Sequence, residues 1–165
     1  DPVVDHPEVA DIRQMIILDY QADHAREIIA GHMNRGAPQN VLGMRDFADN
    51  LVVPEMSFTG VAEEGLVCCA GINPLWDGVG EAWVIASSLL HENRMAVVRA
   101  TKRLLWKMIT YEELWRVQAC VRTDWPEAMR YAEFFGMQNE GVMKRYGPDG
   151  SDYYRYAWVK ECLQN

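Results

Sequence analysis

The last quarter of the chain constrains the fold most, because strand and helix patterns alternate there around clear turn signals. Residues 116–122 form a β-prone run, and a helical segment follows it. Asp124 can cap the N-terminus of that helix, and Pro126 suits its first turn. Gly136 can end the helix in a left-handed conformation. Two aromatic runs then flank a turn at residues 148–150, which predicts strand, helix, strand, turn and strand in that order.

The rest of the chain alternates strands and helices in the same way. Apolar runs and helical faces are separated by glycine, proline and asparagine turn signals. The predicted elements are strands at residues 12–18, 56–62, 66–72 and 81–87, turns at 73–74 and 77–80, and helices at 21–33, 44–51 and 93–111. The full order is therefore β-α-α-β-β-β-α-β-α-β-β. This order predicts an α/β fold whose mixed sheet carries helices on both faces.

Length and composition fit one compact domain over residues 1–165. Of these 165 residues, 49% are hydrophobic, which is enough for a sizeable core. The net charge of -8 argues against general nucleic-acid binding. No apolar run is long enough to span a membrane, and the N-terminus lacks the basic and apolar segments of a signal peptide. We therefore expect a cytoplasmic protein that binds neither nucleic acid nor membrane.

Residues with reactive side chains form no recognisable metal or nucleophile motif. The cysteines, two of them adjacent at Cys68 and Cys69, lack metal-ligand spacing, and no His-Glu-x-x-His pattern occurs. No serine lies in the Gly-x-Ser-x-Gly elbow of serine hydrolases. Cys120, within a predicted strand, is interpreted as a core or sheet-face thiol rather than a nucleophile. We therefore expect no metal site and reduced thiols.

The C-terminal elements resemble those of the GNAT superfamily of N-acetyltransferases, in which a helix ends in a glycine, an apolar residue follows, and the next strand contains a glycine. The corresponding residues here are Gly136, Met137 and Gly141. The order of elements along nearly the whole chain is also similar to that fold. The resemblance implies a mostly antiparallel sheet and an acyl-CoA-dependent N-acetyltransferase. Its substrates would be acetyl-CoA and an amine, carried by a small molecule or by a lysine or N-terminus of a protein.

The resemblance also implies an acetyl-CoA site between the fourth strand and the long helix. In that family the pantetheine arm lies along the strand, and the pyrophosphate sits at the helix N-terminus, where the helix dipole favours an anion. The corresponding residues are Ile85, Ala86 and Ser87 on the strand and Asn93, Arg94, Met95 and Ala96 at the helix start. Residues 88–96 contain no glycine, whereas the family loop does. We therefore expect weak acetyl-CoA binding.

A carboxylate base and a tyrosine acid complete the site that the resemblance implies. Glu81 opens the predicted fourth strand and is the candidate base, although a surface carboxylate at a strand end would look the same. In the family, the acid is often a tyrosine four residues before the helix-ending glycine, and that position is Ala132 here. Tyr131 lies about 100° away around the helix. It could donate a proton only if the helix were rotated, and we expect it to be a packing residue otherwise.

A second resemblance implies a different class of function. The strand at residues 82–88, its glycine-free loop, the basic helix and residues 125–131 are similar to GNAT-like proteins of tailed bacteriophages, including the internal virion protein A type. In this interpretation acetyl-CoA binding is lost, and the fold has a structural, virion or host-protein-binding role. The protein would then act in the host cytoplasm or the virion with a phage or host protein as partner. A homodimer is compatible with either interpretation.

Overall fold

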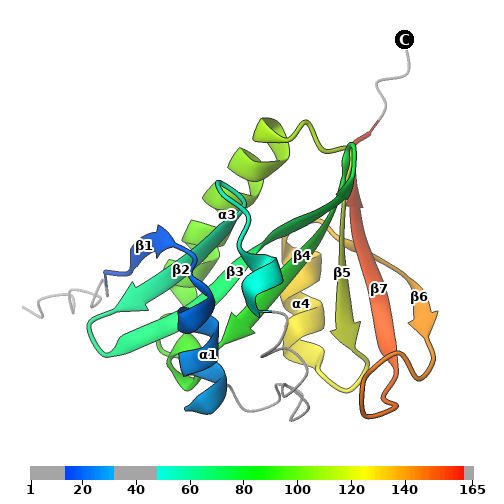
Figure 1. Cartoon of the computed structure of the whole chain (residues 1–165). Helices are drawn as coiled ribbons and strands as arrows, with labels where there is room; N and C mark the ends of the chain where they lie inside the picture. The colour runs from blue at the N-terminus through cyan, green and yellow to red at the C-terminus, as the bar shows by residue number, and fades with distance from the viewer. Residues whose placement is uncertain (1–13, 32–47, 162–165) are drawn as a thin grey trace, which may run out of the picture.

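A seven-stranded sheet, with strand order β1-β2-β3-β4-β5-β7-β6, organises the protein (Figure 1). The computed structural model describes residues 14–31 and 48–161. Neighbouring strands are antiparallel, except that β4 and β5 are parallel. The strands are β1 (Ile16–Asp19), β2 (Ser57–Ala62), β3 (Gly65–Trp76), β4 (Val79–Ala86), β5 (Arg116–Arg122), β6 (Gln138–Met143) and β7 (Tyr153–Val159). The predicted α/β fold with a mixed, mostly antiparallel sheet is confirmed.

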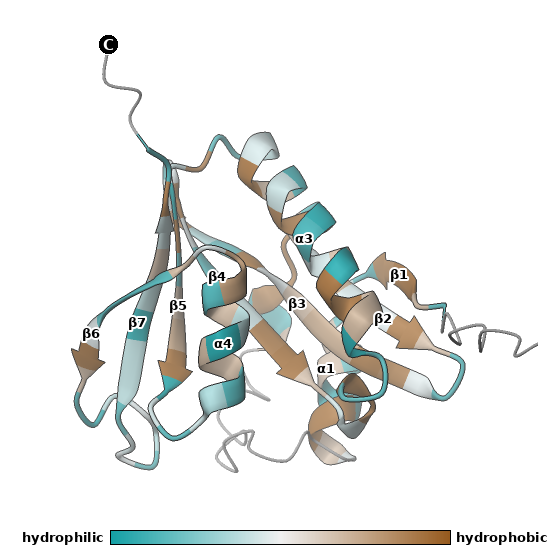
Figure 2. Ribbon diagram, turned by 180° about the vertical axis from the view of Figure 1, so that it is seen from behind, coloured by the Kyte–Doolittle hydropathy of each residue, from teal (hydrophilic) through white to brown (hydrophobic). Residues whose placement is uncertain are grey.

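Helices cover both faces of this sheet, as predicted. One face carries the first helix and a 3₁₀ helix, and the other carries the last two α-helices (Figures 1 and 2). The helices are α1 (Ala22–Ala30), η1 (Ala48–Leu51), η2 (Ser88–Leu90), α3 (Arg94–Tyr111) and α4 (Pro126–Phe134). Alternate residues of β4 point to the two layers, because successive side chains of a strand face opposite ways. Ala82 packs in the cluster beneath α3 and α4, and Ile85 packs in the cluster beneath α1.

The predicted ends of several elements differ from the observed ones. The turn expected at residues 73–74 is wrong, because β3 continues to Trp76. A register shift between Pro74 and Trp76 lets the strand continue through a residue that has no N–H to donate. Of the helix expected at residues 44–51, the part before residue 48 lies outside the described residues, and the rest forms η1. Residues 12–13 and 32–33 of the first strand and helix also lie outside them.

The boundaries of α4 show one wrong prediction and one that is confirmed. Asp124 does not cap the helix, because both its carboxylate oxygens accept hydrogen bonds from Arg122 at 2.9 Å. The N-cap position falls on Trp125, which makes no side-chain cap bond, and Pro126 begins the helix as expected. At the other end, Gly136 has a φ of 83°, the left-handed conformation that the sequence predicts.

The two parallel strands diverge soon after they meet, and this opening positions the site. β4 and β5 are adjacent and parallel, but they pair only from Val79 to Glu81 on β4 and from Arg116 to Gln118 on β5. Beyond these residues the strands separate into a V, while β5 stays paired with β7 over its whole length (Figure 1). Figure 2 shows α4 in front of the opening. Within the described residues, the edge of β4 beyond Glu81 is thus left without a partner strand.

Candidate active site

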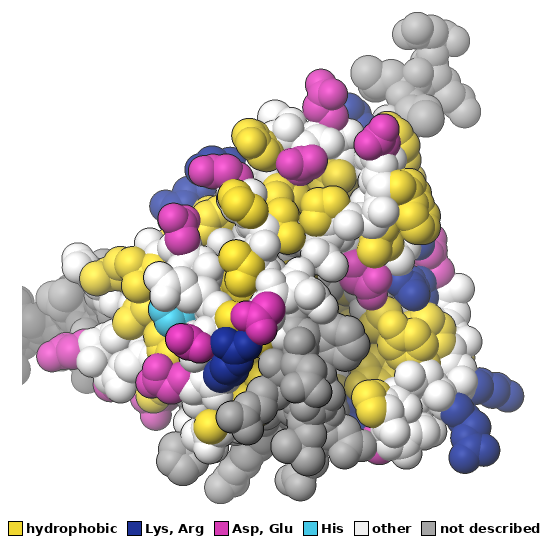
Figure 3. Space-filling view, in the orientation of Figure 1, with side chains coloured by type: hydrophobic (Ala, Val, Ile, Leu, Met, Phe, Trp, Pro, Cys, Tyr) yellow, Lys and Arg dark blue, Asp and Glu magenta, His cyan; other side chains and the backbone are white. Residues whose placement is uncertain are grey.

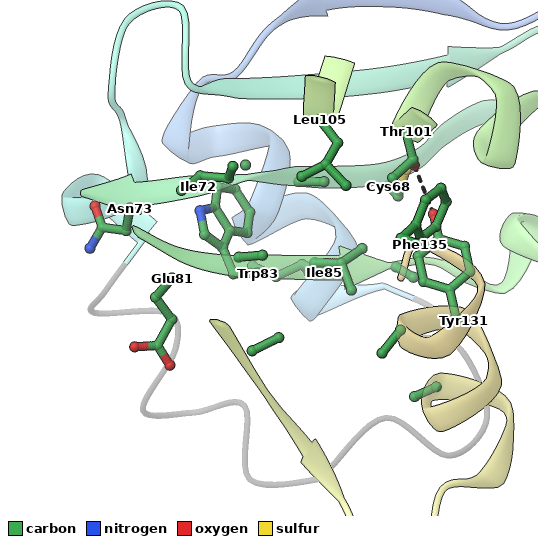
Figure 4. A pocket seen from close by; sticks show the side chains of 18 of the residues that line it. Cys68, Ile72, Asn73, Glu81, Trp83, Ile85, Thr101, Leu105, Tyr131 and Phe135 are labelled. Carbon is green, nitrogen blue, oxygen red and sulfur yellow. Dashed lines mark hydrogen bonds between the residues drawn. The ribbon is translucent and has the colours of Figure 1, made fainter. Parts of the chain in front are cut away.

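The opening between β4 and β5 holds a cavity of about 670 Å³. Helices α3 and α4 wall it on one face of the sheet, and residues of β3, β4 and the β6–β7 turn wall it elsewhere. Figure 4 shows Glu81 at one end of this cavity and Tyr131 with Thr101 at the other. The apolar side chains that line it include Ile72, Val84, Leu105, Ala119 and Phe135. A mostly apolar cleft with a few polar groups is the usual form of a small-molecule site.

The free edge of β4 presents backbone polar groups to this cavity. The amide of Ser87 donates to the carbonyl of Val67 on β3 at 2.9 Å, and this bond fixes the alternation of the β3–β4 ladder. Ile85 and Ser87 therefore turn their N–H and C=O groups toward β3. The residues that turn theirs toward the opening are Ala82, Val84 and Ala86. Of the three strand positions suggested by the resemblance, only Ala86 offers its backbone to the cavity.

Ser87 closes the narrow connection between β4 and α3. Its hydroxyl lies 2.7 Å from the carbonyl oxygen of Leu66 and 3.0 Å from that of Val67, and it accepts a hydrogen bond from the amide of Leu89. The amides of Leu90 and Asn93 also donate to carbonyls within this turn. The glycine-free loop is therefore a closed 3₁₀ turn that uses these amides internally.

The start of α3 is open, in contrast to the loop before it. The first intrahelical bond runs from the amide of Val97 to the carbonyl of Asn93, so the amides of residues 94–96 have no carbonyl within the helix to which they could donate. Asn93 is buried and its side chain does not cap the helix; its Nδ2 donates to Leu89, and its buried Oδ1 has no partner among the residues that the structure describes. Arg94 and Met95 are exposed. Free amides, the helix dipole and Arg94 together favour an anion at this helix start.

Glu81 lies where β4 and β5 part, as the last residue of β4 that pairs with β5. Its Oε1 accepts a hydrogen bond from the Cys120 thiol at 3.1 Å, and Arg155 Nη1 lies 3.7 Å from the same oxygen. The Cys120 thiol also contacts the Tyr146 hydroxyl at 3.6 Å. Acidic, basic and hydrophobic side chains lie close together over β5 and β7 on this face (Figure 3). The predicted base thus belongs to a cluster at the point where the cavity begins.

Burial and the contacts within this cluster keep its thiol and phenol protonated. Burial raises the pKa of Cys120 to about 11; the contact with Tyr146 lowers it, and Glu81 raises it again. The contact with Cys120, followed by burial, raises the pKa of Tyr146 to about 12. A thiol that stays protonated at neutral pH donates hydrogen bonds and is a poor nucleophile. Cys120 therefore behaves as a sheet-face thiol in the sense that its sequence context predicts.

Tyr131 lies at the other end of the cavity and joins the two helices. Its hydroxyl is hydrogen-bonded to the Thr101 hydroxyl of α3 at 2.7 Å (Figure 4), and its ring packs edge-on against Phe135. Burial raises the pKa of Tyr131 to about 12, although the bond to Thr101 lowers it. Ala132, at the family's acid position, is buried in the core cluster beneath α3 and α4. Tyr131 thus packs between helices, with its hydroxyl occupied by Thr101.

The described residues also bear on metals and membranes. Within residues 14–31 and 48–161, no three histidine, cysteine, aspartate or glutamate side chains group in a way that could hold a metal ion. No helix in that same part of the chain is long and apolar enough to cross a membrane.

Comparisons with known proteins identify the fold. No protein-family model and no curated protein matches the sequence. Among solved structures, Ard1 from Thermoplasma volcanium is similar at a TM-score of 0.69 and 15% identity, over 90% of this chain and 99% of that one. A GNAT-family acetyltransferase from Bacillus anthracis is similar at a TM-score of 0.66 and 17% identity, over 89% of this chain and 96% of that one. A variant of the spermidine N-acetyltransferase SpeG from Vibrio cholerae has a TM-score of 0.62 and 14% identity, over 88% of this chain and 94% of that one.

These likenesses show that the chain has the fold of the GNAT acetyltransferases. At 14–17% identity the likeness is one of fold, and the chemistry has to be argued from this chain's own residues.

Proposed function

We propose that the protein is an N-acetyltransferase that moves the acetyl group of acetyl-CoA to an amine. The observation that carries this proposal is the opening between β4 and β5, with a free backbone edge along one side and the Glu81 carboxylate at its apex. GNAT acetyltransferases in general use acetyl-CoA, which supports the donor. The acceptor is an amine of a small molecule or of a protein.

The described residues fit acetyl-CoA in the strand part of the site and fit it less well at the loop. The backbone groups of Ala82, Val84 and Ala86 would hold the pantetheine amides, since they point into the opening and pair with no other described strand there. The amides of residues 94–96 and the Arg94 guanidinium would hold the pyrophosphate. The closed η2 turn offers fewer free amides than a glycine-rich loop would. Binding is therefore expected to be weak.

Glu81 would act on the amine, and acetyl-CoA when bound supplies the thioester. An ammonium cannot attack a carbonyl, so it must first give one proton to a base, which is the role proposed for Glu81. In the balanced reaction, a C–N bond forms, the C–S bond breaks, and the second amine proton goes to the CoA thiolate. No tyrosine is assigned to that last transfer, because Tyr131 is held by Thr101. Backbone N–H groups of the β4 edge and water would stabilise the thiolate instead.

A non-catalytic role is the second candidate, and a specific observation favours it. The loop before α3 uses several of its amides internally, as expected if the fold had lost acetyl-CoA and become a binding module. The resemblance to GNAT-like phage proteins fits that role, with a phage or host protein as partner. We infer that the free amides of residues 94–96 and the free β4 edge favour catalysis over this alternative.

Ligand-dependent thermal stability separates the two candidates. A ligand present at 100 times its Kd stabilises the native state by about 2.7 kcal/mol. For a domain of this length, that raises Tm by roughly 5–11 °C. Arg94→Ala should reduce the shift, whereas Arg99→Ala, an exposed arginine further along α3, should not. No shift at millimolar acetyl-CoA would leave the binding-module role as the better account.

Product formation completes the test of the proposed function. The purified protein is incubated with acetyl-CoA and a panel of amines, including a polyamine and a lysine peptide, and acetylated products are identified by mass spectrometry. Acetylation that disappears in Glu81→Gln at neutral pH supports the proposal. A thermal shift without any acetylated product would contradict the proposed transferase function and show that the fold binds acetyl-CoA without using it.

A further inference from the structure

We propose that Glu81, Cys120 and Tyr146 act as one hydrogen-bonded unit, in which Cys120 is the positioning residue for the Glu81 carboxylate. The catalytic meaning of this unit rests on the function proposed above, but the unit itself is tested independently of it. The three side chains come from β4, β5 and the β6–β7 turn, and all three line the cavity. They are joined in sequence by contacts of 3.1 Å and 3.6 Å through the central sulfur.

The parting of the strands is what brings Cys120 to Glu81. Glu81 pairs with Gln118, and Cys120 lies two residues further along β5 on the same face. Had the ladder continued, Cys120 would lie opposite Trp83. Because β4 diverges there, the thiol turns back to the carboxylate at the apex. The opening that would admit acetyl-CoA and the support of the base therefore arise from the same feature of the sheet.

The β6–β7 turn that carries Tyr146 is held in place by several polar contacts. Arg122, two residues beyond Cys120 on β5, donates to Asp149 of the turn at 3.1 Å. Within the turn, the amide of Gly147 donates to the carbonyl of Ser151 at 2.9 Å. The Tyr146 ring packs edge-on against Tyr153, with centroids 5.4 Å apart. These contacts fix the hydroxyl beside the thiol, so Cys120 is held from both sides.

Cys120 is the hydrogen-bond donor to Glu81 because the nearby arginines are either too distant or paired with other carboxylates. Arg155 of β7 contributes an ionic contact, but 3.7 Å is too long for a hydrogen bond, and its buried Nη1 has no hydrogen-bond partner among residues 14–31 and 48–161. Arg116 is paired with Glu140, and Arg122 with Asp124 and Asp149. In the described part of the chain, the thiol therefore supplies the hydrogen bond that orients this carboxylate.

The first experiment measures the coupling without any need for activity. The rate of alkylation of Cys120 by iodoacetamide is followed against pH by peptide mass spectrometry in wild type, Glu81→Gln and Tyr146→Phe. Removing the Glu81 charge should lower the pH midpoint, because that carboxylate raises the pKa of the thiol. Removing the Tyr146 hydroxyl should raise the midpoint, because its hydrogen bond lowers that pKa. Identical midpoints in all three proteins would overturn the proposal.

A thiol in the same molecule serves as the control. Cys69 has no exposed surface, and its contact is with Thr59 rather than with the cluster. Its alkylation reports unfolding, so it should stay slow wherever the Cys120 midpoint is read. The unit is supported if the pH midpoint of Cys120 shifts in opposite directions in Glu81→Gln and Tyr146→Phe while Cys69 stays unreactive. Equal shifts of the two thiols would show that the substitutions loosen the whole fold, and the proposal would fail.

The second experiment tests positioning through catalysis with acetyl-CoA and an acceptor from the panel. Cys120→Ala should lower kcat about tenfold with little change in the KM for acetyl-CoA, since a hydrogen bond to a charged group is lost. Cys120→Ser keeps a donor and should restore most of the lost kcat. An acetylated Cys120 peptide, or a serine variant as slow as the alanine one, would contradict a positioning role. Absence of turnover in wild type would refute the proposed function and leave the unit to the alkylation result.

Discussion

The hydrogen bond between Tyr131 and Thr101 gives a sharp test of how α3 and α4 are joined. Tyr131→Phe removes the hydroxyl but keeps the ring and its contact with Phe135. A typical intramolecular hydrogen bond contributes about 1 kcal/mol net. Thr101 left behind can bond to the carbonyl of Val97 one turn earlier, which keeps the loss near that value. We expect Tm to fall by about 2–4 °C, since 1 kcal/mol has that effect in a domain of this length.

A double-mutant cycle isolates this bond from other effects of the substitutions. Thr101→Val should cost about as much as Tyr131→Phe, and the double variant should cost little more than either, which gives a coupling free energy of about 1 kcal/mol. Thr110→Val is the matched control, because its hydroxyl donates to the carbonyl of Trp106 within the same helix. The free energy of unfolding is measured by urea denaturation. The losses in free energy of unfolding from Tyr131→Phe and the control Thr110→Val should add. If the losses from Tyr131→Phe and Thr101→Val also added, the interhelical bond would be refuted.

The remaining predictions concern the base, Tyr131 and two glycines. Glu81→Gln should lower kcat/KM at neutral pH by roughly 10²–10⁴-fold, with partial rescue at higher pH, where the amine loses its proton without a base. Equal pH–rate profiles for Glu81→Gln and wild type would remove Glu81 from the mechanism. Acetyl transfer by Tyr131→Phe should stay near wild type, and a large loss would assign that hydroxyl a chemical role. Gly78→Ala should destabilise more than Gly136→Ala in urea denaturation. Both glycines have positive φ, but a Cβ on Gly78 would meet the Trp115 ring at 2.2 Å, whereas one on Gly136 has 3.7 Å to its nearest atom.

The C-terminal half of the fold could be predicted because its signals are local. Gly136 and the turn at residues 148–150 act within a few residues of themselves, and both structures form. The prediction that Asp124 caps the helix is wrong because its carboxylate accepts hydrogen bonds from Arg122. The Arg122 side chain reaches that carboxylate only when the end of β5 has folded. The length of β3 was missed because a proline is a turn signal in sequence but fits a strand at an irregularity.

The candidate site was predictable in outline and not in detail. The resemblance indicated Glu81 and the start of α3, and the structure places both at ends of the parted strands. Which residues of β4 face the opening depends on ladder register, which the sequence does not encode locally; Val84 and Ala82 were therefore missed. Cys120 and Tyr146 were also missed as partners of Glu81, because they lie 39 and 65 residues from it in the chain. Alternation along β5 was the one signal for the thiol.

Calorimetric titration with acetyl-CoA tests the central claim most directly. The claim is that the opening between β4 and β5 binds the donor, so a side chain that fills it should abolish binding. Val84 is 45% exposed and lines the cavity, and Val142 on β6 is 51% exposed and does not line it. We predict weak binding by wild type and Val142→Trp, and none by Val84→Trp. Absence of binding at millimolar acetyl-CoA in wild type, or equal binding by both variants, would contradict the account.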